Sequence, residues 1–551
     1  MSILNRDERS GLFGEFAHLY LHSVHMKKTT LIILLCHGLL RSVAQPTAHR
    51  EQTESGTKES LEITASFDGL GFGFEGPQGR TWFRNPSDNS LAVGPDHIVQ
   101  TVNSRMAIFT KKGKRFTETG KALYGPAETR NVFRGFGGPC ERLNNGDAVV
   151  RYDQFADRWL VMMPTFRRDR LRNDSADYTG KWLPQPGDPE PLFQPGPTFD
   201  DQPKARPKLP PDTVGSYCMC YAVSATPDPM GTWYRYEFKR DLFPDYPRPA
   251  IWHNGYYSTT STGDHLNERH AYVADRDNML KGLPATEQHF IIKDVNFLIH
   301  ADTDGREMPP PGTPAILLAT GGDQLNKVTR DDGIYVWKHH TDWTDPSKSR
   351  LEGPEKIAVE PYAYLGGGQL TKAVPQPGTD MRLDAQGDKL MARVVYRRKG
   401  RTERIVGLHS VATANDKGGV RWYEFQVARN RTIRLMQQGT FAPPDGYRWM
   451  ASPAIDGAGN ILIGYSYGDA TVFPGQRMAG QSANGPRGLL DLKEVVLVNG
   501  EGAQTSTLRW QDYTQTAVDP TDDRTIWYVG DYLKAGAPEY SSRIAAVRVK
   551  D

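Results

Sequence analysis

The 551-residue sequence has little net charge, few cysteines and hardly any helical pattern. The formal net charge is +2, so no basic field indicates a nucleic-acid-binding protein. An apolar run at residues 31–40 is far shorter than the roughly 20 residues that a membrane-spanning helix needs. After the first 45 residues, no window keeps apolar residues at i, i+3, i+4 and i+7 over three turns. These absences favour an all-β protein without a membrane span.

The N-terminal region has the pattern of a secretory signal with an internal start. Met26-Lys27-Lys28 supplies the positive segment, residues 31–40 supply the apolar segment, and Ser42-Val43-Ala44 supplies the small residues before cleavage. We therefore expect a secreted protein, periplasmic or extracellular. The expected segments are an upstream extension at 1–25, the signal peptide at 26–45, a disordered linker at 46–60 and one folded domain at 61–551.

Three cysteines follow the signal, namely Cys140, Cys218 and Cys220. Export favours a disulfide, and an odd number leaves one free thiol. We predict that Cys140 pairs with Cys220. Cys218-Met219-Cys220 does not indicate a zinc site, because no second Cys or His pair stands at ligand spacing.

A repeated pattern organises the rest of the chain. Seven times a short apolar run ends at a turn rich in Asp, Gly or Asn, and a second run follows directly. The seven instances begin at Ser90, Ala148, Arg248, Thr313, Met381, Ser452 and Thr516. Such self-similarity is typical of propellers and solenoids, in which each unit buries its faces against its neighbours. The usual spacing, about 65 residues, leaves room for four strands and a sizeable loop in each unit.

We predict a seven-bladed β-propeller with four-stranded antiparallel blades. The 54 glycines, 39 prolines and 10% aromatic residues suit a turn-dense all-β chain. One repeat is longer because it contains residues 167–211, which are polar and rich in proline. Proline cannot donate to a β-ladder, so we interpret this stretch as a loop inserted in one blade. We expect residues 543–549 to pair with a strand near 61–67, which would close the ring and protect the sheet edges.

Five longer runs resemble a family of uncharacterised secreted bacterial proteins that are predicted to be β-propellers. The runs are GFGGPCERLNNGDAVVRYDQFADRW, LDAQGDKLMARVVYR, GVRWYEF, YRWMASPAIDGAGNILIGYS and RWQDYTQTAVDPTDDRTIWYV. The resemblance covers roughly residues 66–549. It implies the propeller fold and export, and it implies no particular chemistry.

The mouth of the axial channel is the strongest candidate site. The innermost strands of a propeller all start at the same mouth, so residues just before each apolar run should ring it. In this register the ring contains five aspartates, namely Asp88, Asp147, Asp245, Asp380 and Asp512, with Pro311 in the fourth blade and Trp449 in the sixth. Such like charges require a cation, a basic ligand or nearby arginines such as Arg382 and Arg448. Alternatively, the aspartates cap turns by accepting hydrogen bonds from backbone N–H groups.

Two kinds of chemistry fit an aspartate ring. Oxygen ligands suit calcium better than zinc, so calcium is the expected cofactor, with Asp88, Asp147 and Asp380 as its ligands. Carboxyl groups with raised pKa values also suit acid–base chemistry on sugars, with Asp147 and Asp512 as the catalytic pair.

Aromatic and basic residues extend the candidate site. Tyr246, Trp449 and Tyr513 are placed to pack against a sugar ring, while Arg448 and the remaining carboxylates, Asp88, Asp245 and Asp380, hold hydroxyl groups.

A second candidate set lies in the fifth repeat. Arg393, Tyr396 and His409 would form a lyase-like Tyr/Arg/His set if the sheet brought them to the mouth. Alternatively, His409 is a buried core residue, because it is flanked by apolar residues of a predicted strand.

We therefore expect a secreted, monomeric propeller that binds an extracellular polysaccharide or oligosaccharide at the mouth. If it is an enzyme, it is a polysaccharide lyase or a glycoside hydrolase. The alternative is a non-catalytic scaffold for extracellular protein interaction or adhesion, which docks through its blade faces or the Pro-rich loop. A deep polar mouth favours the first hypothesis, and a plugged mouth with a large exposed apolar patch favours the second.

Overall fold

The computed structural model describes residues 51–550, apart from 82, 84, 167–216, 241–242, 263–264, 294, 296, 323–330 and 369. The expected upstream extension, the signal peptide and the Pro-rich loop at 167–211 lie outside the described residues.

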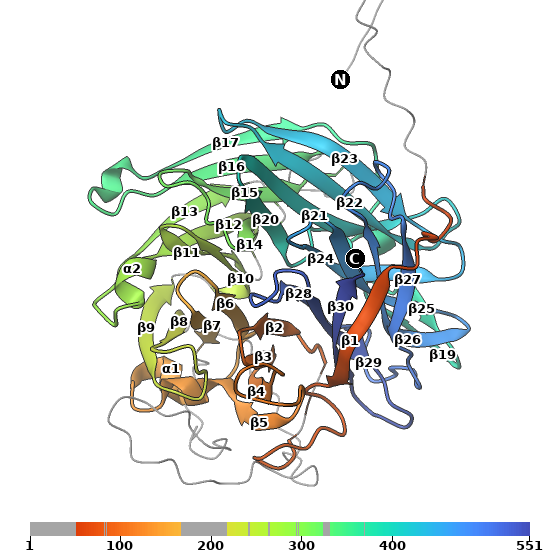
Figure 1. Cartoon of the computed structure of the whole chain (residues 1–551), viewed down its shortest axis with the longest axis horizontal. Coiled ribbons are helices and arrows are strands. Elements are labelled where there is room, and N and C mark those ends of the chain that lie inside the picture. The colour runs from red at the N-terminus through yellow and green to blue at the C-terminus, as the bar shows by residue number, and fades with distance from the viewer. Residues whose placement is uncertain are drawn as a thin grey trace, which may run out of the picture. The chain divides into compact units, whose positions relative to one another are not determined.

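The described residues form seven four-stranded blades that follow one another around a common centre (Figure 1), which confirms the predicted propeller. Five blades are separate sheets, and blades four and five are joined into one eight-stranded sheet. The innermost strands, in chain order, are β2 (Ser90–Val93), β6 (Val149–Asp153), β10 (Asp245–Trp252), β14 (Ile299–Asp304), β20 (Val394–Lys399), β24 (Tyr447–Ile455) and β28 (Gln515–Val518). Each contacts the innermost strand of the next blade, and the contact between β28 and β2 closes the ring.

The other strands lie outward from these in sequence order. They are β3 (His97–Val102), β4 (Arg105–Thr110) and β5 (Ala122–Glu128) in blade one; β7 (Arg158–Phe166), β8 (Tyr217–Ser224) and β9 (Trp233–Arg240) in blade two; β11 (Gly255–Thr262), β12 (His265–Ala274) and β13 (Glu287–Lys293) in blade three; β15 (Ala315–Thr320), β16 (Ile334–His340) and β17 (Arg350–Ile357) in blade four; β21 (Thr402–Ala412), β22 (Gly418–Val427) and β23 (Ile433–Phe441) in blade five; β25 (Ile461–Asp469), β26 (Val472–Gln481) and β27 (Leu492–Val498) in blade six; and β29 (Ile526–Tyr532) with β30 (Ser541–Val549) in blade seven. The α-helices α1 (Gly138–Arg142) and α2 (Arg276–Met279) are short, and no helix within the described part of the chain has the length and apolar character of a membrane span.

The seventh blade joins the two ends of the domain, as predicted. Its outermost strand, β1 (Leu61–Asp68), pairs antiparallel with β30, from Leu61 opposite Val549 to Asp68 opposite Arg543. The N-terminal strand thus covers the edge that β30 would otherwise expose.

The predicted innermost strands of blades four and five were wrong. Ile316 belongs to β15, the second strand of blade four, and Leu383 belongs to a hairpin of β18 (Val374–Gln376) and β19 (Thr379–Leu383) outside the blades. The true innermost strands, β14 and β20, pair with each other in parallel. The apolar pattern failed because the buried strand β14 carries polar side chains, including Asp302 and Asp304, that line the channel.

The predicted disordered linker is held in place over its described part, residues 51–60. Gln52 forms a bridge with Phe441, and Lys58 forms one with Leu492. The Gln52 amide also donates to the carbonyl oxygen of Leu490 at 2.9 Å. Backbone hydrogen bonds at Gln52 and Lys58 therefore attach this segment to blades five and six.

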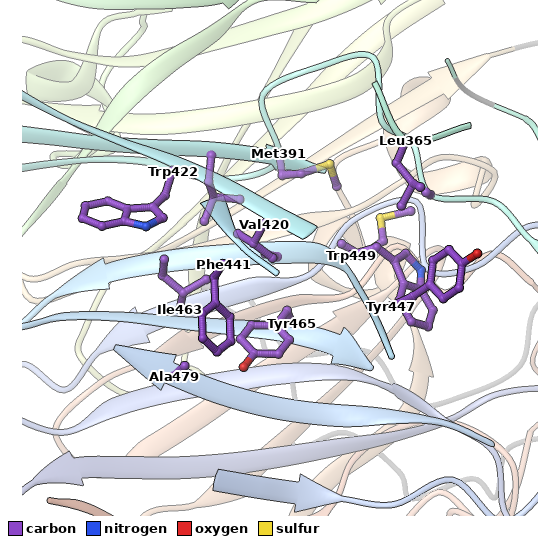
Figure 2. Packing of buried hydrophobic residues seen from close by; sticks show 14 of the residues in the cluster. Leu365, Met391, Val420, Trp422, Phe441, Tyr447, Trp449, Ile463, Tyr465 and Ala479 are labelled. Carbon is purple, nitrogen blue, oxygen red and sulfur yellow. The ribbon is translucent and has the colours of Figure 1, made fainter. Parts of the chain in front are cut away.

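Apolar side chains fill the space between successive blades. Figure 2 shows Trp422 and Phe441 of blade five beside Ile463 and Tyr465 of blade six. Each blade buries both of its faces in this way, as expected of a repeat whose units cannot form a core alone.

The predicted disulfide is confirmed. Cys140 of α1 is bonded to Cys220 of β8, while Cys218 is a buried free thiol. The bond closes a loop with a sequence separation of 80 residues. A loop of that size corresponds to about 4–5 kcal/mol of stabilisation in the chain-entropy model.

Candidate functional site

Four of the five predicted ring aspartates gather where the innermost strands begin. Asp88, Asp147, Asp245 and Asp512 come from blades one, two, three and seven, and each acts electrostatically on at least one of the others. The amide Nδ2 of Asn103 donates to Asp88 Oδ2 at 2.6 Å and to Asp147 Oδ1 at 3.3 Å. We call this group the acidic mouth.

Left-handed backbone conformations recur near the innermost strands. Non-glycine residues with positive φ lie within or before several innermost strands: Asp88 at 51°, Tyr246 at 54°, Gln386 at 48°, Met450 at 48° and Asp512 at 60°. Left-handed conformations are uncommon for such residues and concentrate at functional sites, where the surrounding structure must stabilise them. Here the packed ring of strands supplies that support.

The acidic mouth holds carboxyl groups that retain their protons to unusually high pH. Burial, and then the charges of Asp245 and Asp512, raise the pKa of Asp147 to about 7. Burial, and then Asp147 and Asp512, raise the pKa of Asp88 well above its usual value, and burial followed by Asp512 raises that of Asp245. Asp88 is only 1% exposed, whereas Asp147 and Asp245 are partly exposed. Asp147 is therefore an accessible acid that titrates near neutral pH.

Asp512 has a different environment because basic and amide groups bind it. The guanidinium of Arg509 holds both of its oxygens, with Nε 3.0 Å from Oδ1, and the Gln386 amide donates to Oδ1 at 3.2 Å. Lys389 donates to Asp388 at 2.9 Å and also bonds to Gln386. The acidic mouth thus combines protonatable acids with one carboxylate that is ion-paired.

An aromatic and cationic layer lies at the same level of the channel. The Arg248 guanidinium carbon lies 3.3 Å from the ring centroid of Tyr246 and 3.6 Å from that of Tyr513. The two tyrosine rings meet edge to face, and Val149 and Ala392 pack with them. We call this layer the plug, because it packs side chains from several blades together at the starts of the strands. Tyr246 and Tyr513 are thus at the predicted mouth.

Asp380, Trp449 and Arg448 lie away from the acidic mouth, which corrects the predicted ring. Asp380 is exposed on the β18–β19 hairpin, because the predicted register of blade five was wrong. Trp449 is fully buried in the core between blades five and six (Figure 2), where it packs on Trp510. Arg448 is also fully buried and donates to Glu494 Oε2 at 2.8 Å.

The lyase-like set is likewise not assembled. Tyr396 donates to Glu403 at 2.6 Å within the core, and His409 lies 2.9 Å from the Tyr423 hydroxyl. His409 is completely buried, and this burial lowers its pKa to about 3, as the core interpretation predicts. Arg393 enters the channel instead.

Several residues of the acidic mouth were missed by the sequence analysis. Arg509 stands three residues before Asp512, and this pairing was a usable signal. Asn103 lies in the turn between β3 and β4, and Gln386 and Lys389 lie between β19 and β20. Their roles depend on the blade register, which no local pattern reveals.

Calcium binding stays a prediction. In the described part of the chain, no group of three or more His, Cys, Asp or Glu side chains is arranged to hold a metal ion. Asp88 and Asp147 face each other through Asn103, and the third predicted ligand, Asp380, lies on the separate hairpin.

A cavity of about 160 Å³ occupies the opposite end of the channel, where the innermost strands finish. We call it the axial cup. Its floor is crossed by ion pairs: Asp302 Oδ2 lies 3.1 Å from Arg151 Nε and 2.9 Å from Arg393 Nε, and Arg393 Nη2 lies 2.6 Å from Asp304 Oδ1. Arg393 also donates to the Thr516 carbonyl oxygen, so these pairs connect blades two, four, five and seven.

Comparison with known proteins finds distant structural likenesses. No family model matches it, and neither does any curated protein. A protein of unknown function from Dyadobacter fermentans DSM 18053 is 10% identical, with a TM-score of 0.31, over 89% of this chain and 100% of that chain. The NanB sialidase from Streptococcus pneumoniae is 9% identical, with a TM-score of 0.37, over 74% of this chain and 68% of that chain. The WD40 domain of SCAP from fission yeast is 9% identical, with a TM-score of 0.34, over 85% of this chain and 96% of that chain. These likenesses are too distant to indicate an activity, and membership of the resembled secreted family stays a prediction.

Proposed function

We propose that this propeller binds an extracellular glycan at the acidic mouth and hydrolyses it with Asp147 as general acid. The observation that carries the proposal is the convergence of four aspartates from four blades, with the pKa of Asp147 raised to about 7. A carboxyl group that titrates near neutral pH can donate a proton under ordinary conditions, as acid–base catalysis requires.

The groups around Asp147 supply what a sugar needs for binding. The amides of Asn103 and Gln386 and the guanidinium of Arg509 donate hydrogen bonds to the aspartates. Sugar hydroxyl groups would share or replace these bonds. Tyr246 is partly exposed, and the part of its ring that Arg248 and Tyr513 leave uncovered could contact the C–H face of a sugar ring.

Hydrolysis fits the acidic mouth better than a lyase reaction. Glycoside hydrolysis uses two carboxyl groups in different protonation states. Protonated Asp147 would give its proton to the departing glycosidic oxygen, while Asp512, paired with Arg509, would take a proton from the water that adds to the anomeric carbon. The separation of Tyr396 from His409 and Arg393 removes the alternative set.

An exported, non-catalytic scaffold is the second candidate. The Cys140–Cys220 disulfide supports export for either function. The large exposed apolar side chains of the described residues are spread over different elements: Ile63, Leu283, Ile291, Leu370, Met436, Leu489 and Val496. This scatter gives no support to a large apolar docking patch, whereas the plug at the mouth agrees with this second candidate.

A screen of the full-length protein against a glycan array, followed by turnover of each bound glycan, tests the proposal. Asp147→Asn and Asp512→Asn should each abolish turnover, whereas Asp380→Asn, an exposed aspartate on the hairpin, should behave as wild type. Turnover that survives both substitutions, or a wild-type protein that binds no glycan, would contradict the proposal.

A further inference from the structure

The axial cup has a surplus of hydrogen-bond donors. Its lining includes three arginines and three aspartates, namely Arg151, Arg306, Arg393, Asp302, Asp304 and Asp523. Asp523 is also paired with Arg397, which does not line the cup. Counting that partner, four guanidinium groups face three carboxylates.

The acceptor atoms of the cup floor are already occupied. Asp302 Oδ1 accepts the Ile251 N–H at 2.8 Å, and its Oδ2 is shared by Arg151 and Arg393. Both oxygens of Asp304 accept from Arg393, at 2.6 and 3.3 Å. All four oxygens of these two aspartates therefore already accept hydrogen bonds from the protein.

Donors remain, however, on residues that line the cup. The hydrogen bonds of Arg151 within the described residues use Nε and Nη1, which leaves its second terminal nitrogen for a ligand. Arg306 is exposed at the rim. Within the described residues it donates a hydrogen bond through Nη2 alone, to the carbonyl oxygen of Thr521. The buried hydroxyl of Tyr152 has no partner among the described residues.

Part of the remaining wall of the cup is apolar, and Gln154, Thr303, Gln515 and Thr516 also line it. Leu91, Val93 and Ile251 line its buried part, and Phe155 and Val518 are partly exposed at its opening. A volume of about 160 Å³ suits a ligand of a few carbon atoms rather than an oligosaccharide.

We propose that the axial cup binds a small monocarboxylic acid, with its carboxylate toward Arg306 and Arg151 and its carbon chain against the apolar wall. This site is separate from the proposed glycan site, because the acidic mouth lies where the innermost strands begin and the cup lies where they end. Burial, partly offset by Asp302 and reinforced by Arg393, lowers the pKa of Arg151 to about 10, and an added anion would relieve that unfavourable environment.

Calorimetric titration of the full-length protein with hexanoate and with hexanamide tests the inference, because the two probes differ mainly in charge. Hexanoate should bind at least about tenfold more tightly than hexanamide, since hydrogen bonds to charged groups are the stronger ones. Arg306→Gln should weaken hexanoate about tenfold, and Arg434→Gln, an exposed arginine of β23, should leave it unchanged.

A second variant tests the position of the ligand. Ala517→Leu adds bulk to the cup lining and should weaken both probes in a protein that keeps its thermal midpoint. Equal affinity for the two probes, or absence of hexanoate binding, would overturn the inference. So would a hexanoate affinity that is unchanged in both Arg306→Gln and Ala517→Leu. None of these outcomes bears on the glycan screen.

Discussion

Replacing Asp147 by Asn should make the protein more stable at neutral pH, because folding raises the pKa of Asp147 and Asn carries no charge at that position. The folded pKa of Asp147, about 7, lies above its usual value of 3.8. The folded protein therefore binds a proton that the unfolded chain has released, and stability falls as pH rises between about 4 and 7. Roughly three pKa units at about 1.4 kcal/mol each give at most about 4 kcal/mol.

The difference in free energy of unfolding between Asp147→Asn and wild type, measured in urea from pH 5 to pH 8, checks this prediction. The advantage of the variant should grow with pH and reach at most about 4 kcal/mol at pH 8, because neutral Asn avoids the charge that wild type acquires. Asn keeps the size of Asp and can still contact Asn103. Asp380→Asn serves as the matched control and should follow wild type at every pH. A variant that is less stable than wild type at pH 8, or an advantage that does not change with pH, would refute the reasoning.

Three further predictions concern the scaffold. Arg393→Met should lower the free energy of unfolding by about 3–5 kcal/mol, measured in urea, because its two aspartate partners stay buried without it; a change below 1 kcal/mol would contradict the ion-pair network. Replacing Cys140 and Cys220 together by Ser should cost about 2–5 kcal/mol, and added reductant should then have no further effect on the variant. Deleting residues 51–68 should expose β30 and make the protein elute earlier than the full-length protein in size-exclusion chromatography, as larger aggregates; absence of aggregates would show that β1 is dispensable.

The fold was largely predictable because five blades begin with apolar innermost strands. The runs around Val93, Tyr152, Ile251, Ile455 and Val518 all belong to innermost strands, and the repeat pattern finds them. Ring closure and the disulfide also followed from the sequence.

The repeat pattern predicted the wrong innermost strands in blades four and five for a physical reason. The buried strand β14 is polar because Asp302 and Asp304 pair with Arg393, which is about ninety residues away in sequence. The sequence analysis identified the acidic mouth only in part, because the positions of the residues that bind its aspartates depend on the register of the blades. The positive φ values of Asp88 and Asp512 have no local sequence signal either.

A double-mutant cycle on Asp147 and Asp512 tests the convergence of the aspartates most directly. The urea stabilities of Asp147→Asn, Asp512→Asn and the double variant are compared at pH 8. Because each carboxylate repels the other, the account predicts that the double variant differs from the sum of the single changes by more than 0.5 kcal/mol. Additivity within about 0.3 kcal/mol would mean that the two residues do not interact, and it would contradict the acidic mouth itself.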